Sequence, residues 1–299
     1  MDIKASVTSS GEQIFTLETI QTRETPAIVS TEWLEQSMDN PRLVILDIRA
    51  PEDYMKGHIP MAVNVPASSF IVTRNGLLLE IPEKEDLFKT IGSSGVSKDS
   101  IVVIVHLTNN PYLLADAART AFTLIYAGVR NVSVLTGGID KWKLENKPLS
   151  VTTVAPKATA YTSEVYSGMI VTKDYVEQQI GKTLIVDARD PGVYFGVSIE
   201  PFAPRPGHIP TAVNLPTPWF WTPEGMYKEK SELLKMVEGI VGTDTAREII
   251  VYCGVGGYGS VSWFVQHEVL GYANVKLYDG SAQEWVSDLK APLSSYSWK

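Results

Sequence analysis

The sequence has little of three things, and each shortage excludes a class of protein. It holds a single cysteine, Cys253, so the chain can form no internal disulfide. No apolar run approaches the roughly 20 residues that a membrane-spanning helix needs. The 26 basic residues are outnumbered by 34 acidic ones and form no cluster, which is unlike a nucleic-acid-binding surface. We therefore expect neither a membrane nor a nucleic acid among the partners.

An internal repeat divides the 299 residues into two halves. Residues 57–66 return as residues 207–216, with eight of ten positions identical around the motif Gly-His-Ile-Pro. An Asp-x-Arg motif precedes each copy, and a glycine and a tryptophan follow each copy in the same order. A chain of this length suits two domains of about 100–200 residues. The repeat therefore predicts two copies of one domain.

Both halves alternate short apolar runs with amphipathic stretches. Residues 43–47 and 101–105 of the first half correspond to residues 183–187 and 249–252 of the second, and all four read as buried strands. Strands that alternate with helices predict an α/β fold, here two parallel sheets with helices on both faces of each.

The domain boundaries follow from the repeat and from composition. We expect a flexible N-terminal segment over residues 1–27, a first domain over 28–150, a linker over 151–160 and a second domain over 161–299. The linker is rich in Thr, Ala and Pro. Residues 1–27 lack the basic-then-apolar layout of a signal peptide, which favours a cytoplasmic location and leaves a periplasmic or secreted one open.

The cysteine lies at the centre of one distinctive stretch. Cys253 ends the apolar run 249–252 and begins a turn with glycines at 254, 256, 257 and 259, after which residues 261–269 show helical spacing. A glycine-rich turn can point successive N–H groups inward as an anion cradle, and a helix N-terminus adds a positive dipole end. Both would favour the thiolate, so we expect a reactive cysteine.

This stretch has two other interpretations. A lone cysteine is often an inert, buried residue. A glycine-rich turn between a strand and a helix can also bind phosphate, but no Gly-Lys-Ser/Thr follows this one. The corresponding positions of the first half, 106–110, hold neither a cysteine nor a glycine cluster. We therefore expect the first half to support the structure and to shape the substrate site.

Taken together, these motifs resemble the rhodanese (sulfurtransferase) family, in tandem over residues 28–290, with an inactive first and an active second domain. The resemblance implies that the Cys253 thiolate takes the outer sulfur of a donor, thiosulfate by default, and passes it to cyanide or a thiol. It implies no metal and no cofactor. It also implies that the persulfide is held by the loop residues Gly254, Val255, Gly256, Gly257, Tyr258 and Gly259.

The chain departs from the family pattern where substrates bind. Val255 and Val193 occupy positions where members of the family carry basic residues that contact an anionic donor. Arg189, Arg205 and Trp221 are the remaining candidates for substrate contacts. Arg189 has an alternative role as a structural ion pair with the aspartate of its Asp-x-Arg motif, and the two Gly-His-Ile-Pro histidines are expected to be structural hydrogen-bonding residues.

Three functional classes stay open at this point. The first is a sulfurtransferase acting on a small sulfur-containing anion or thiol. The second is a persulfide carrier or sulfur-sensing module that serves a protein thiol acceptor, and the third is a purely structural interaction protein. A phosphatase of the related Cys-x5-Arg type is disfavoured because Gly259 stands where the phosphate-binding arginine would be.

Overall fold

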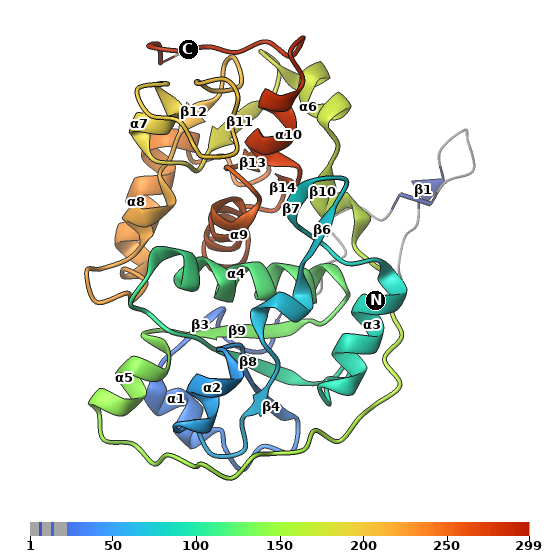
Figure 1. Ribbon diagram of the computed structural model, residues 1–299, viewed down its shortest axis with the longest axis vertical. Helices are drawn as coiled ribbons and strands as arrows, with labels where there is room; N and C mark the ends of the chain where they lie inside the picture. Colours follow the sequence, from blue (N-terminus) through green and yellow to red (C-terminus); the bar gives the residue numbers. More distant parts are fainter. Residues whose placement is uncertain (1–5, 8–12, 15–22, 299) are drawn as a thin grey trace.

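The computed structural model describes residues 6–7, 13–14 and 23–298 (Figure 1). Most of the N-terminal segment that was expected to be flexible therefore lies outside the described residues. Two short strands within it form an antiparallel pair, β1 (Ser6–Val7) and β2 (Gln13–Ile14). No helix within the described ranges is long and apolar enough to span a membrane.

Each half of the chain forms one five-stranded parallel sheet, which confirms the predicted fold class. The first sheet has the order β3-β9-β8-β4-β5 and the second the order β10-β14-β13-β11-β12. The strands of the first sheet are β3 (Ile28–Val29), β4 (Leu43–Asp47), β5 (Val63–Asn64), β8 (Ile101–Val105) and β9 (Asn131–Leu135). Those of the second are β10 (Ile170–Val171), β11 (Leu184–Asp187), β12 (Val213–Asn214), β13 (Ile249–Tyr252) and β14 (Val275–Tyr278).

The helices follow the strands in the same order in both domains. The first domain contains α1 (Thr31–Gln36), α2 (Pro51–Met55), α3 (Lys84–Ser93), α4 (Pro111–Tyr126) and α5 (Gly138–Leu144). The second contains α6 (Lys173–Gln179), α7 (Pro191–Tyr194), α8 (Lys230–Val241), α9 (Gly257–Phe264) and α10 (Ser281–Ser287). Ser30 and Thr172 cap α1 and α6 by accepting from backbone N–H groups, as their positions before each helix predict.

Short single-turn segments and one hairpin complete the description. The 3-10 segments are η2 (Ala67–Phe70), η3 (Ser167–Met169) and η4 (Thr217–Phe220), and a π-helical turn, η5 (Val265–Val269), extends α9. The hairpin of β6 (Val72–Arg74) and β7 (Leu77–Glu80) belongs to the first domain. No sequence pattern predicts this hairpin or the two-residue edge strands β3 and β10.

One apolar core joins the two domains. It contains the inner faces of α3 and α4 from the first domain and of α8 and α9 from the second. Helices α4 and α9 lie side by side between the two sheets (Figure 1), where Phe122 meets Trp263 edge-on with ring centroids 4.8 Å apart. The outer faces of the sheets bury separate clusters under α1, α2 and α5 and under α6 and α10.

Polar contacts also cross this interface. Arg119 of α4 is buried and donates to both carboxylate oxygens of Asp279, at 2.5 and 3.1 Å, just after β14. The amide of Gln283 on α10 bonds both backbone groups of Leu78 in the β6–β7 hairpin. The ion pair of Arg119 and Asp279 is buried, and together with the Gln283 contacts it adds polar links to the apolar packing between the domains.

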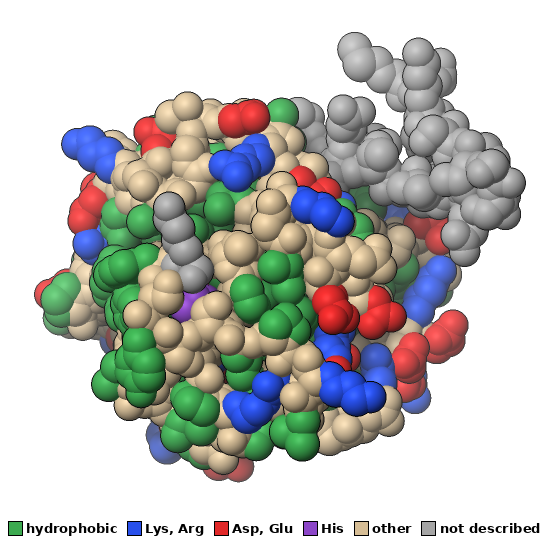
Figure 2. Space-filling view, turned by 90° about the horizontal axis from the view of Figure 1, so that it is seen from above, with side chains coloured by type: hydrophobic (Ala, Val, Ile, Leu, Met, Phe, Trp, Pro, Cys, Tyr) green, Lys and Arg blue, Asp and Glu red, His purple; other side chains and the backbone are tan. Residues whose placement is uncertain are grey.

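The outer surface carries no single-sign field on the face drawn in Figure 2. Lys and Arg side chains there lie singly or beside Asp and Glu and form no continuous basic patch.

Candidate active site

Cys253 lies where the sequence placed it, between a buried strand and a helix. It follows β13 directly, and α9 begins four residues later at Gly257. The thiol is 2% exposed, and the N–H of Gly256 donates to its Sγ atom at 3.1 Å. Because β13 is the central strand of its sheet, the cysteine occupies the carboxyl end where α/β proteins gather ligand-binding loops.

The loop needs glycine for two distinct reasons. Gly256 has φ +92°, and a Cβ there would lie 2.9 Å from Oδ1 of Asp279. Gly254 has ordinary backbone angles, but a Cβ there would collide with the Glu200 carboxylate. The left-handed conformation of Gly256 curves the loop around the sulfur, and the N–H of Gly256 points toward Sγ in this conformation.

Opposing influences act on the pKa of the Cys253 thiol. Burial raises the pKa of Cys253 above its ordinary value, and the Glu200 carboxylate raises it further. The backbone N–H groups of Gly259, Val255 and Gly256 lower the pKa, but burial outweighs them. The loop N–H groups therefore favour the thiolate, in the direction that the glycine pattern predicts, while burial and the Glu200 carboxylate, which the sequence does not reveal, act against it.

A cavity of about 140 Å³ opens in front of the thiol. Its walls come from both domains. The first domain contributes Leu79, Tyr112, Ala115 and Asp116. The second contributes Arg189, Asp190, Val193 and Glu200 together with the cysteine loop. The site is therefore complete only with both domains, which agrees with a substrate-shaping role for the first.

Arg189 reaches this cavity, but its guanidinium is already engaged. Its Nε and Nη2 atoms donate to Asp187 at 3.0 and 2.6 Å, and its Nη1 donates to Glu200 at 3.2 Å. Asp187 is fully buried and also accepts from the Tyr252 hydroxyl at 2.7 Å. Arg189 is therefore a structural ion-pair residue, and the carboxylates of Asp187 and Glu200 offset the positive charge that a substrate would meet.

The structure does not bring Arg205 to the cysteine. Its guanidinium donates to the backbone carbonyls of Val286 at 3.1 Å and Ala291 at 3.0 Å, and also to those of Trp285 and Asp288. These four acceptors lie at the C-terminal end of α10 and beyond it. Arg205 therefore ties the inserted segment before the second Gly-His-Ile-Pro motif to this helix, and the expected substrate contact is not present.

Trp221 is also absent from the cavity wall. It is 6% exposed and packs edge-on against Tyr258, with ring centroids 6.3 Å apart, and against Tyr227. Tyr258 itself lines the cavity and stacks on Tyr112 of the first domain at 5.9 Å. Trp221 thus supports the cavity wall from behind, and the expectation of a direct substrate contact is not met.

The Gly-His-Ile-Pro histidines are structural, as the sequence analysis expected. Nδ1 of His208 donates to the carbonyl of Tyr194 at 2.8 Å, and its ring stacks on that of Tyr194. His58 makes the same contacts with Tyr54 in the first domain. Both pairs pin the turn before the next strand.

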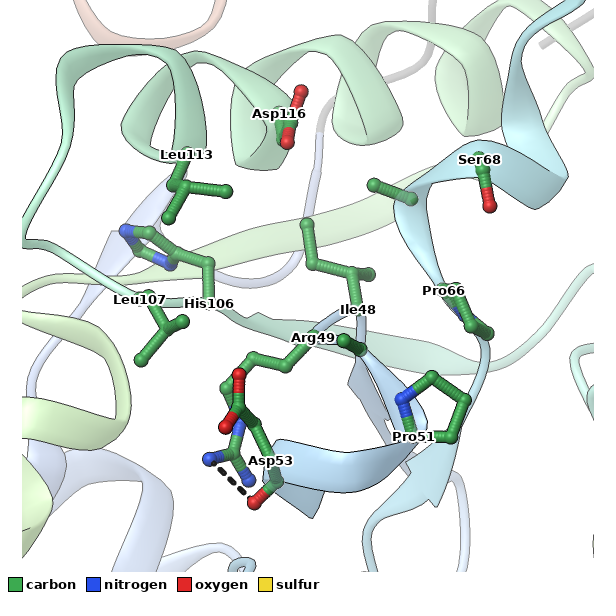
Figure 3. A pocket seen from close by; sticks show the side chains of 12 residues that line it. Ile48, Arg49, Pro51, Asp53, Pro66, Ser68, His106, Leu107, Leu113 and Asp116 are labelled. Atoms are coloured by element: carbon green, nitrogen blue, oxygen red, sulfur yellow. Dashed lines mark hydrogen bonds between the residues drawn. The ribbon is translucent and has the colours of Figure 1, made fainter.

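The first domain has its own cavity at the corresponding place (Figure 3). Asp47 pairs with Val105 in the first sheet as Asp187 pairs with Tyr252 in the second, so His106 stands where Cys253 stands. This cavity measures about 580 Å³. Burial lowers the pKa of His106 to about 4, so at neutral pH its imidazole is uncharged. The first domain therefore has a pocket but no nucleophilic sulfur.

Sequence reasoning missed the most informative wall residues. Glu200 lies in the ten-residue insertion before the second Gly-His-Ile-Pro motif, and an acidic residue in an extra loop carries no signal of its own. Asp116 sits among the apolar residues of α4, and only the packing of α4 on α9 brings it to the cysteine. A single thiol in a small cavity, faced by backbone N–H donors, is suited to covalent chemistry through sulfur.

Comparison with known proteins agrees with this geometry. The family model of the rhodanese-like domain matches twice, over residues 30–145 and 172–288. A Mycolicibacterium smegmatis protein named "Putative thiosulfate sulfurtransferase" is 31% identical over 274 residues, covering 89% of this chain and 96% of that protein. The Thermus thermophilus protein named "Sulfur carrier protein TtuD" is 31% identical over 290 residues, with 89% and 96% coverage.

Solved structures share the fold. The anaerobic ergothioneine biosynthesis enzyme from Chlorobium limicola, in complex with trimethyl histidine, superposes with a TM-score of 0.76 at 21% identity, covering 91% of this chain and 70% of that one. YnjE superposes with a TM-score of 0.78 at 21% identity, covering 91% and 68%. From the two family matches and the relatives together, the chain belongs to the rhodanese family of sulfurtransferases and carries two rhodanese-like domains in tandem.

Proposed function

We propose that this sulfurtransferase carries sulfur as a persulfide on Cys253. The observation that supports it best is the position of the one thiol, 3.1 Å from the backbone nitrogen of Gly256, in a small cavity at the end of the central strand. In the first half-reaction the Cys253 thiolate attacks the outer sulfur of thiosulfate, the S–S bond breaks, and sulfite leaves with the bonding electron pair. In the second, cyanide or a thiolate attacks the outer sulfur and the Cys253 thiolate leaves.

We further propose a division of labour between the domains. Residues 161–299 form the catalytic domain, residues 28–150 form a domain without sulfur chemistry, and residues 151–160 link them. His106 at the cysteine-equivalent position supports this division. The N–H groups of Val255, Gly256 and Gly259 stabilise the anionic persulfide, since they already lower the pKa of the thiol and so favour the thiolate.

Thiosulfate is the default donor because several relatives, including those from Mycolicibacterium and Saccharopolyspora, are named for it. The second candidate function is a persulfide carrier that loads once and unloads only to a protein thiol. The name of the Thermus relative supports it, as do the apolar Val193 and Val255 in the cavity wall.

Steady-state kinetics distinguish these two functions. Initial rates of thiocyanate formation, measured over a grid of thiosulfate and cyanide concentrations, are expected to give parallel lines in a double-reciprocal plot, because sulfite leaves before cyanide binds. Intersecting lines would contradict a covalent intermediate. One equivalent of sulfite per chain followed by a stall, with no thiocyanate, would instead support the carrier.

A further inference from the structure

The cavity in front of Cys253 is acidic. Three carboxylates line it, those of Asp116, Asp190 and Glu200, against the single guanidinium of Arg189. That guanidinium is neutralised by the buried Asp187, which receives two of its donors. An anion that enters the cavity therefore meets like charges, and a cation meets opposite ones.

One of these three carboxylates, Asp116, carries a negative charge that no described residue pairs with. It comes from α4 of the first domain and borders both the Cys253 cavity and the cavity of its own domain, shown in Figure 3. Within the described residues it has no hydrogen-bond or ion-pair partner, whereas Glu200 bonds Arg189. Burial raises the pKa of Asp116 to about 6, which leaves it mostly ionised at pH 7. A half-buried carboxylate without a cation is stabilised by any ligand that brings one.

Aromatic rings lie at the rim of the same cavity. Tyr112 is 71% exposed and stacks on Tyr258 at 5.9 Å with an interplanar angle of 13°. The electron-rich faces of tyrosine rings attract ammonium and guanidinium groups. The remaining walls include the apolar side chains of Leu79, Ala115, Val193 and Val255.

We propose that the sulfur acceptor is a small organic cation with a thiol group, and that Asp116 is the residue that selects for its positive charge. This inference rests on the proposed function, because it concerns the second half-reaction of the same site. Loading adds a negative charge on the persulfide, which strengthens the preference for a cation. The acceptor thiolate attacks the outer sulfur, the Cys253 S–S bond breaks, and the cysteine thiolate leaves with the electron pair.

The test uses three small thiols of similar size and different charge: cysteamine, 2-mercaptoethanol and 3-mercaptopropionate. Protein loaded with sulfur is mixed with each thiol, and intact-mass measurement follows the loss of about 32 Da for one sulfur atom. Each rate is divided by that of the same thiol with a small disulfide in solution, which removes differences in thiol reactivity. We expect the corrected rate of sulfur loss with cysteamine to exceed that with 3-mercaptopropionate by about tenfold or more, which corresponds to about 1.4 kcal/mol.

Asp116→Asn is expected to reduce this ratio about three- to tenfold. The matched control is Asp86→Asn on α3, an exposed residue outside both cavities with the same change of charge, and it should keep the wild-type ratio. A second readout needs no variant. Added KCl should slow sulfur transfer to cysteamine but not to 2-mercaptoethanol, because salt screens the attraction between the ammonium group and the cavity carboxylates.

The outcomes are separable. A wild-type protein that loads and unloads with equal corrected rates for all three thiols overturns the inference and leaves the proposed function intact. A normal ratio in Asp116→Asn overturns the role of Asp116. A protein that accepts no sulfur from thiosulfate or 3-mercaptopyruvate overturns the proposed function, and the inference with it.

Discussion

Replacing Cys253 by serine is expected to abolish sulfur transfer, with a loss of turnover of at least about a thousandfold. A serine hydroxyl has nearly the same size but stays protonated and cannot hold a sulfane sulfur. Because the buried thiol is contacted by backbone N–H groups of its own loop, from which a serine hydroxyl can also accept, the fold should survive. Thiocyanate formation from thiosulfate and cyanide measures the loss, and circular dichroism checks the fold.

The chain supplies its own control for this experiment. His106 stands at the equivalent position of the first sheet, so His106→Gln should retain most of the turnover if the first domain performs no sulfur chemistry. Turnover above about a tenth of the wild-type value in Cys253→Ser would show that another group carries the sulfur.

Glu200→Gln is expected to activate the cysteine. The Glu200 carboxylate raises the pKa of the Cys253 thiol, so its neutral amide should lower that pKa and increase the thiolate fraction at pH 7. Since Arg189 donates to Glu200 and an amide oxygen still accepts, the local geometry should be kept. We expect alkylation by iodoacetamide at pH 7 to become on the order of tenfold faster, with the rate–pH profile displaced toward lower pH.

The same substitution removes a negative charge from the cavity and should speed loading by thiosulfate. Glu224→Gln provides the matched control, because Glu224 is exposed on a loop outside the cavity and loses the same charge. An unchanged alkylation profile in Glu200→Gln would contradict the influence of Glu200 on the thiol pKa.

Much of the fold could be predicted because the sequence contains the same domain pattern twice. The repeat fixed the equivalence of the two halves, and the continuous apolar runs 101–105 and 249–252 match the central strands β8 and β13 residue for residue. Buried parallel strands read as unbroken apolar runs, which a sequence shows directly. The two-residue strands β3 and β10 and the β6–β7 hairpin are too short for any periodicity to show.

The site was predictable only as far as the cysteine loop. Glycine spacing located Cys253 and its N–H donors, since these are local in the chain. The thiol pKa depends instead on burial and on Glu200, and the cavity wall depends on Asp116 and Tyr112, which the packing of α4 on α9 brings across the domain interface. Arg205 was a reasonable candidate by charge, but its neighbours are carbonyls that only the folded chain gathers.

The two domains contribute different parts of the site. The second domain supplies the sulfur, the N–H donors and the Asp187–Arg189–Glu200 network. The first supplies a wall, held in place by the buried pair of Arg119 and Asp279.

The most direct test of the central claim is the intact mass of the protein after mixing with thiosulfate, and separately with 3-mercaptopyruvate. The account predicts a gain of about 32 Da, one sulfur atom, on wild-type protein, its absence on Cys253→Ser, and its removal by cyanide. No gain from either donor, or the same gain on Cys253→Ser, would contradict a Cys253 persulfide.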